Sequence, residues 1–167
     1  MEANHLRKYK ERYGKLRSFL EEKHWQEPLV KADRGIVIAF IVSYGILLGY
    51  DLLYTRERFL RHTVIPLTGL AAVSLIRRLI NRKRPYEMTG IEPLIKREGT
   101  GESFPSRHVC SAVLIALQMP VPWKYGFLLL ALLEVFLRTA AGVHYLSDTV
   151  VGFMFGLLWN SLLLHIL

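Results

Sequence analysis

The stretch Gly35–Tyr50, GIVIAFIVSYGILLGY, contains 16 residues and no charge. A helix made of these residues is apolar around its whole circumference, which is typical of a helix enclosed by lipid or by a large protein core. Four more apolar blocks follow it: Thr63–Ile76, Val109–Trp123, Tyr125–Leu137 and Thr149–Leu164. A chain of 167 residues is too small to cover five such helices in a soluble fold. The pattern therefore favours an integral membrane protein.

The length of the blocks leaves an alternative open. Each is shorter than the roughly 20 residues that cross a bilayer, so a soluble protein with buried core helices must be considered. Basic residues at the block ends can supply the missing length by extending to the interface; they are Arg58, Arg61, Arg77 and Lys124. We expect an all-α, polytopic membrane helical bundle with about five transmembrane helices, two of them before the long polar connector 81–105.

The first 30 residues differ in kind from the rest. Apolar and aromatic side chains recur there at spacings of three and four: Leu6, Tyr9, Tyr13, Leu16 and Leu20. Basic residues fill the positions between them, and the whole chain carries a net charge of +8. We expect residues 1–30 to form an amphipathic interfacial helix that meets anionic headgroups, followed by a membrane domain over 31–167. A solvated helix that packs on a partner is the alternative. No folded module that reads nucleic acid bases is visible.

Polar residues gather where the apolar blocks begin and end. Ser106, after Pro105, is a typical N-cap, and together with Arg107 and His108 it could also form an anion site at a helix N-terminus. Both readings are open from these residues alone. Because successive spans cross the membrane in opposite directions, we expect three of these polar ends to lie at the same membrane face.

The other two span ends bring cations and a histidine to this face. Arg77 and Arg84 are seven residues apart, so both project on one face if the helix continues until Pro85 ends it. His144 and Asp148 are four apart and can meet across one helical turn. Such a pair either activates an imidazole as a nucleophile or is an ordinary hydrogen-bonded pair.

Three ordered motifs carry a family resemblance. The chain reads R-x6-R-P over 77–85, P-S-R-H over 105–108 and L-R-x5-H-x3-D over 137–148. This order resembles the type 2 phosphatidic acid phosphatases, integral membrane relatives of bacterial acid phosphatases and vanadium haloperoxidases. Their pattern is K-x6-R-P, P-S-G-H and S-R-x5-H-x3-D. The resemblance covers about residues 60–165.

The resemblance implies a metal-independent lipid phosphate phosphatase without a cofactor. His144 would attack phosphorus to form a phosphohistidine, Asp148 would hold its ring, and His108 would protonate the departing oxygen. The phosphate oxygens would be surrounded by Arg77, Arg84, Ser106, Arg107 and Arg138. Substrates of this class are phosphatidic acid, phosphatidylglycerophosphate and polyprenyl diphosphates.

Three positions depart from the family pattern. Arg77 replaces lysine, Arg107 replaces glycine and Leu137 replaces serine. None of these changes removes a group that attacks phosphorus or transfers a proton, so we expect activity with altered affinity or substrate choice. A catalytically silent subunit that binds lipid phosphate, or a phosphotransferase with an acceptor other than water, are the alternatives.

Two further expectations come from charge. Glu134 interrupts an apolar block four residues before Arg138, so we expect it to pair with this arginine and aim it at the phosphate. Residues 1–34 contain nine Lys and Arg. For a multi-pass protein of the cell membrane this favours a cytoplasmic catalytic face, although many bacterial members of the family act on the outer face.

Overall fold

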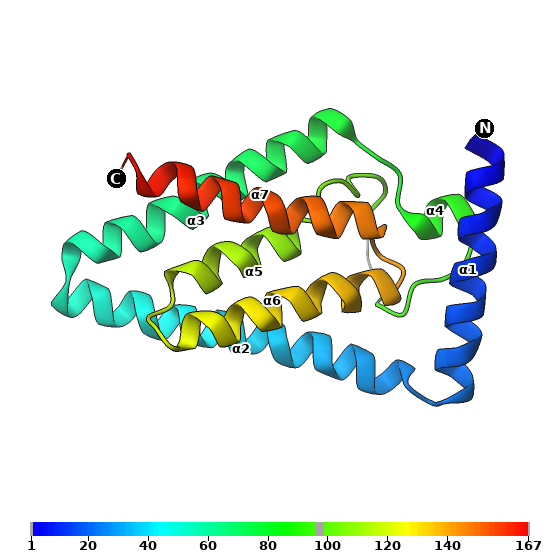
Figure 1. Ribbon diagram of the computed structural model, residues 1–167, viewed down its shortest axis with the longest axis horizontal. Helices are drawn as coiled ribbons and strands as arrows, with labels where there is room; N and C mark the ends of the chain where they lie inside the picture. The colour runs from blue at the N-terminus through cyan, green and yellow to red at the C-terminus, as the bar shows by residue number, and fades with distance from the viewer. Residues whose placement is uncertain (1, 96–98, 167) are drawn as a thin grey trace.

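The computed structural model describes residues 2–95 and 99–166, with side chains from Leu6 onward. The fold is all-α, and its helices are α1 (Glu2–Glu22), α2 (Gln26–Tyr54), α3 (Arg56–Ile80), α4 (Pro85–Thr89), α5 (Arg107–Gln118), α6 (Trp123–Ala140) and α7 (Leu146–Leu164). The five longer helices after α1 form an elongated bundle, and α1 lies across one end of it (Figure 1). The C-terminus lies at the opposite end (Figure 1).

Three segments of the described chain are long and apolar enough to cross a membrane. They are α2, the segment Arg56–Thr89 that contains α3, and α7. By this measure the described residues give three spans, fewer than the five expected. Helix α5 has only 12 residues. Helix α6 has 18 residues, but its charged residues Lys124, Glu134 and Arg138 lower its apolar character.

The outer surface of the bundle is apolar. In α2, Ile38, Ile41, Ile46 and Leu53 are all at least 60% exposed. Several large aliphatic side chains at such exposure on one helix are unfavourable in water but favourable in hydrocarbon. The surface therefore fits a helix bundle surrounded by lipid.

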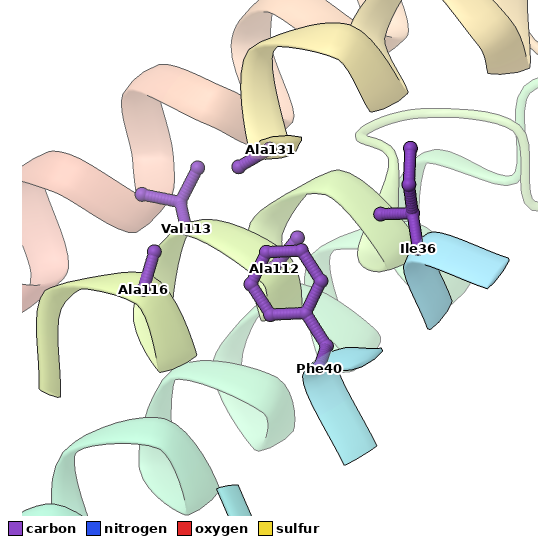
Figure 2. Close-up of a cluster of buried hydrophobic side chains, with 6 residues drawn as sticks. All are labelled: Ile36, Phe40, Ala112, Val113, Ala116 and Ala131. Atoms are coloured by element: carbon purple, nitrogen blue, oxygen red, sulfur yellow. The ribbon is translucent and has the colours of Figure 1, made fainter. Parts of the chain in front are cut away.

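Helix α5 is short but occupies the centre of the bundle, where packing against its neighbours stabilises it. Figure 2 shows Ala112, Val113 and Ala116 of α5 in one cluster with Ile36 and Phe40 of α2 and Ala131 of α6. Helix α7 approaches from another side. A Cβ built on Gly156 of α7 would lie 2.9 Å from the Val113 Cβ, so only glycine allows this separation. Small residues thus let α5 pack closely on its neighbours.

Helix α1 turns its apolar face to the protein rather than to lipid. Tyr13 and Leu20 are buried, and Arg17 Nη1 donates to the Glu92 carbonyl oxygen at 2.9 Å. The exposed side of the helix carries the basic residues Lys8, Lys10, Arg12 and Lys15. The amphipathic pattern led us to expect a helix along the headgroups with its basic residues toward anionic lipid. In the structure, the connector after α3 and the α6–α7 turn lie against its apolar face.

Two local details differ from the sequence-based expectations. Helix α3 ends at Ile80, where Asn81 takes the left-handed conformation with φ 42°, so no continuous helix joins Arg77 to Arg84. Arg84 is extended and begins α4 with Pro85 in the first turn. In addition, α2 begins at Gln26, ahead of the domain boundary expected at residue 31.

Candidate active site

The helix ends that carry the polar residues lie together at one end of the bundle, next to α1. The C-terminal ends of α3 and α6 and the N-terminal ends of α5 and α7 all lie there (Figure 1). Seven of the residues selected from the sequence are at most 5% exposed: Arg77, Arg84, Ser106, Glu134, Arg138, His144 and Asp148. His108 is half-buried and Arg107 is exposed. Several charged side chains buried this deeply need hydrogen-bond or ion-pair partners, so the geometry of the site depends on these partners.

His144 and Asp148 lie close together but do not form a hydrogen bond. The distance from His144 Nδ1 to Asp148 Oδ2 is 3.7 Å, which is beyond hydrogen-bond range. His144 lies in the turn before α7 and not within the helix, so the one-turn geometry expected from the spacing is absent. Burial lowers the pKa of His144 to about 4, and Arg84 and Arg77 act in the same direction. The imidazole is therefore neutral at pH 7, as a nucleophile requires.

Asp148 is held by donors other than His144. Its Oδ1 accepts a hydrogen bond from Arg82 Nη1 at 2.6 Å. Its Oδ2 accepts from the Ser103 hydroxyl at 2.5 Å and from the Tyr145 backbone N–H at 3.0 Å. The carboxylate is fully buried, so these contacts hold its charge in a fixed place beside the imidazole.

Arg84 ties two segments of the site together. Its Nε donates to the Gly101 carbonyl oxygen at 3.0 Å, and its Nη1 donates to the Val143 carbonyl oxygen at 2.9 Å. Arg77 Nη1 donates to the Pro105 carbonyl oxygen at 3.0 Å. Each guanidinium thus anchors a backbone segment next to His144 or Ser106, because an arginine fork has several donors in fixed directions.

Ser106 joins the start of α5 to the start of α7. Its backbone N–H donates to the Asp148 carbonyl oxygen at 2.8 Å, and its side chain caps α5 by accepting from the Val109 N–H at 3.5 Å. Gly152 of α7 makes this contact possible, since a Cβ there would lie 2.5 Å from the Ser106 carbonyl oxygen.

Replacement of Gly152 by alanine is expected to destabilise the protein by about 1–3 kcal/mol, because the added methyl group meets backbone that cannot rotate away. Phosphate release should fall as well, since Ser106 must move. The control is Gly45→Ala, where nothing lies within 4 Å of the new Cβ. Thermal unfolding in detergent and phosphate release measure the two effects. Equal behaviour of the two variants would contradict this prediction.

Arg138 is held by two carboxylates. Its Nε lies 3.1 Å from Glu134 Oε2 and 2.8 Å from Asp33 Oδ1. The Glu134–Arg138 pair expected from the spacing is therefore present. Asp33, from α2, was not foreseen. The available signal was its position just ahead of the apolar block at Gly35, because a buried acid next to a membrane span needs a cationic partner.

A cavity of about 160 Å³ opens beside His108 and Glu134. Its walls come from α2, α5 and α6, and apart from His108, Ser111 and Glu134 they are apolar: Val37, Phe40, Ile41, Ala112 and Ile115. The cavity therefore brings mostly apolar side chains next to two residues selected from the sequence, His108 and Glu134. Within the described part of the chain, no three His, Cys, Asp or Glu residues cluster as a metal site would require.

Sequence reasoning missed several residues that shape the site. Besides Asp33, they are Arg82 and Ser103 on Asp148 and Tyr145, whose ring contacts Tyr9 of α1. Arg82 and Ser103 stand in the connector between α3 and α5. A connector has no periodicity, so its contacts cannot be read from spacing.

Comparisons with known proteins agree with this architecture. The model of the PAP2 superfamily matches residues 58–167. Among solved structures, Aquifex aeolicus LpxE is similar with a TM-score of 0.69 and 20% identity, over 84% of this chain and 86% of that chain.

The first transmembrane PAP2-type phosphatidylglycerolphosphate phosphatase from Bacillus subtilis has the same TM-score of 0.69 and 20% identity, over 98% of this chain and 86% of that chain. No curated protein matches. At this identity the two structures show that the fold, with its multi-pass membrane helices, is shared. The family match covers most of the chain and confirms the resemblance read from the three motifs. The chain belongs to the PAP2 superfamily.

Proposed function

We propose that the protein hydrolyses a lipid phosphate or diphosphate through a phosphohistidine intermediate. The observation that carries this proposal is a buried, neutral His144 beside Asp148, at the end of the bundle where Arg77, Arg84 and Arg138 are also buried. Cations around a nucleophile match the needs of phosphoryl transfer, in which charge spreads over the equatorial oxygens in the transition state.

The first step is attack of His144 on phosphorus. The Nδ1 side of the ring faces Asp148, so Nε2 is the attacking atom and Asp148 stabilises the positive charge that develops on the ring. The P–O bond to the lipid breaks as the N–P bond forms. In the second step water attacks the phosphohistidine, and inorganic phosphate leaves with the neutral imidazole restored.

His108 is the acid and base of the two steps. It lines the cavity between α2, α5 and α6, which supports a departing lipid oxygen on the apolar side of the site. His108 gives this oxygen a proton and then removes one from the attacking water. The cavity then holds the part of the lipid next to the scissile bond, so a phosphate ester with an apolar substituent fits better than a soluble one.

The departures from the family pattern should alter substrate binding, but they leave in place the groups that attack phosphorus and transfer protons. Arg77 keeps the cation, and its fork also anchors the Pro105 carbonyl oxygen, which a lysine would do with less geometric restriction. Arg107 is exposed and can reach a second phosphate group, while its backbone N–H remains for the first. Leu137 removes one hydroxyl group near Arg138. Phosphatidic acid, phosphatidylglycerophosphate and polyprenyl diphosphates remain the candidates.

For the topology we propose five membrane spans, formed by α2, α3, α5, α6 and α7. Residues 1–30 then lie at the interface as a separate amphipathic unit, with the basic side of α1 toward anionic headgroups and its apolar side on the membrane domain 31–167. The excess of Lys and Arg near this end favours the cytoplasmic side. Reporter fusions at each terminus test the orientation.

The test of the proposed function is a substrate panel in detergent, read as released phosphate. We expect release from at least one lipid phosphate or diphosphate, and little from glycerol 3-phosphate, which lacks the apolar part. Binding of these lipids without any release would support the silent subunit instead. Release that appears only when an alcohol acceptor is added, with the phosphoryl group found on that acceptor, would support a phosphotransferase.

Replacement of Glu134 by glutamine tests how Arg138 is aimed. One of the two charge-assisted contacts at Arg138 Nε is lost, while the side-chain shape and the contact with Asp33 are kept. We therefore expect turnover to fall about ten-fold without loss of folding. Glu57→Gln, an exposed acid at the start of α3, is the control. Unchanged turnover in the Glu134 variant would reject the role.

A further inference from the structure

Arg82 makes contacts that the proposed mechanism does not use. Its Nη1 donates to Asp148 Oδ1 at 2.6 Å and to the Ser147 hydroxyl at 2.9 Å. Asp148 is fully buried, whereas the Arg82 side chain is 40% exposed. Arg82 therefore supplies the closest counter-charge to a carboxylate that cannot reach water, and it does so from the polar connector.

The guanidinium of Arg82 is itself held in place by aromatic rings. Its Cζ lies 4.3 Å from the centroid of the Tyr145 ring, which is within the range of a cation–π contact. The Tyr145 ring lies 4.9 Å from the ring of Tyr9, in α1. The contacts thus run from α1 through Tyr145 and Arg82 to the carboxylate beside the nucleophile.

The two oxygens of Asp148 have different tasks in this arrangement. Oδ2 faces His144 and also accepts from Ser103 and Tyr145. Oδ1 accepts from Arg82. A carboxylate held at both oxygens cannot rotate, so Oδ2 remains directed at the imidazole.

We propose that Arg82 is a positioning residue, which holds Asp148 as an anion directed at His144 and which takes its own position from α1 through Tyr145 and Tyr9. The proposal rests on the proposed function for its catalytic meaning but concerns a contact that exists without substrate. It gives α1 a part in catalysis although no residue of α1 carries a catalytic motif.

The expected electrostatic effect depends on every charge near His144. The charged and titratable groups that act on His144 or Asp148 are Arg77 on α3, Arg82 in the connector, Arg84 at α4, Tyr9 on α1, and Asp148 and Tyr145 at the start of α7. Glu102, in the connector, lies 3.8 Å from Arg77. Replacing Arg82 by glutamine removes a cation from this set and leaves Asp148 in place. Protonation of the imidazole becomes easier, so the pKa of His144 rises.

The experiment is a titration of His144 by NMR in the ligand-free, full-length protein in detergent, for wild type and Arg82→Gln. We expect the midpoint to rise by about one pH unit in the variant. In the pH profile of kcat/KM, measured with the best substrate of the panel, the acid limb should also move to higher pH. KM should change less than two-fold. Arg82→Lys, which keeps the charge, should return the midpoint toward wild type.

Arg78→Gln is the matched control, because Arg78 is an exposed arginine four residues earlier, and it should leave the midpoint unchanged. A midpoint that does not move in Arg82→Gln would overturn the proposal. So would a large rise in KM at constant kcat, since that would make Arg82 a substrate ligand. Absence of phosphate release in wild type would reject the proposed function instead, and the titration would still decide the role of Arg82.

The contribution of α1 is tested by a double-mutant cycle. Tyr9→Leu should shift the His144 midpoint in the same direction as Arg82→Gln but less, and the two changes should not add, because both act through Arg82. Phe19→Leu is the control on the same helix, since Phe19 contacts Trp25 and is far along the helix from Tyr145. Additive effects of the two changes would overturn the part assigned to α1.

Discussion

Replacement of His144 by alanine is expected to reduce phosphate release by at least about 10⁴-fold, because removal of a nucleophile also removes the covalent intermediate. The neighbouring guanidinium groups cannot attack phosphorus, and the proposed mechanism uses His108 for proton transfer. The measurement is released phosphate on the best substrate of the panel, for wild type and variant at equal protein concentration. The ring is buried, so thermal unfolding must be compared at the same time.

Two controls separate chemistry from folding in this experiment. His165→Ala removes an exposed imidazole at the far end of the molecule and should leave phosphate release unchanged. Substrate with a labelled phosphoryl group, quenched under alkaline conditions that preserve phosphohistidine, should label wild type but not His144→Ala. A labelled variant, or one that keeps more than about a hundredth of the activity, would remove His144 from the proposed role.

Replacement of Arg84 by alanine is expected to have the second largest effect, a loss of about 10²–10³-fold in kcat/KM. In the proposed mechanism the change removes a cation that would contact the phosphate, and it leaves the carbonyl oxygens of Gly101 and Val143 without their donor. Val143 directly precedes His144, the proposed nucleophile, so we expect the substitution to disturb the position of His144 as well as phosphate binding. Steady-state kinetics should show both a lower kcat and a higher KM.

Arg84→Lys distinguishes the two contributions of this side chain. Lysine keeps the charge but cannot reach Gly101 and Val143 with separate nitrogens in fixed directions. We expect it to restore most of the KM but little of the kcat. Recovery of both constants would mean that the charge alone matters and that the anchoring of Val143 has no catalytic effect.

The sequence predicted the parts of the site that depend on spacing along one helix. Glu134 and Arg138 are four residues apart on α6, and they meet. The three motifs likewise identified the family, since their order and spacing are properties of the chain itself. The all-α membrane architecture followed from the uncharged blocks, although only three segments of the described chain meet the length and apolarity of a span.

The rest could not be predicted, because it depends on contacts between elements. His144 lies outside the helix that carries Asp148, so the four-residue spacing did not give their distance. Asp33 reaches Arg138 from another helix. The apolar stripe of α1 was identified correctly, but an apolar stripe does not say whether lipid or protein will cover it. Here the bundle covers it.

The shortness of α5 has a consequence for where the reaction takes place. Twelve residues span about 18 Å, well short of the roughly 30 Å of a hydrocarbon core. In the proposed five-span topology, the segments that flank α5 must complete its crossing of the bilayer, so Ser106 and His108 at its start would lie below the lipid headgroups. A substrate can then stay anchored in its own leaflet while its ester bond is cut. Water and the released phosphate, rather than the lipid, would then move between the site and the membrane surface.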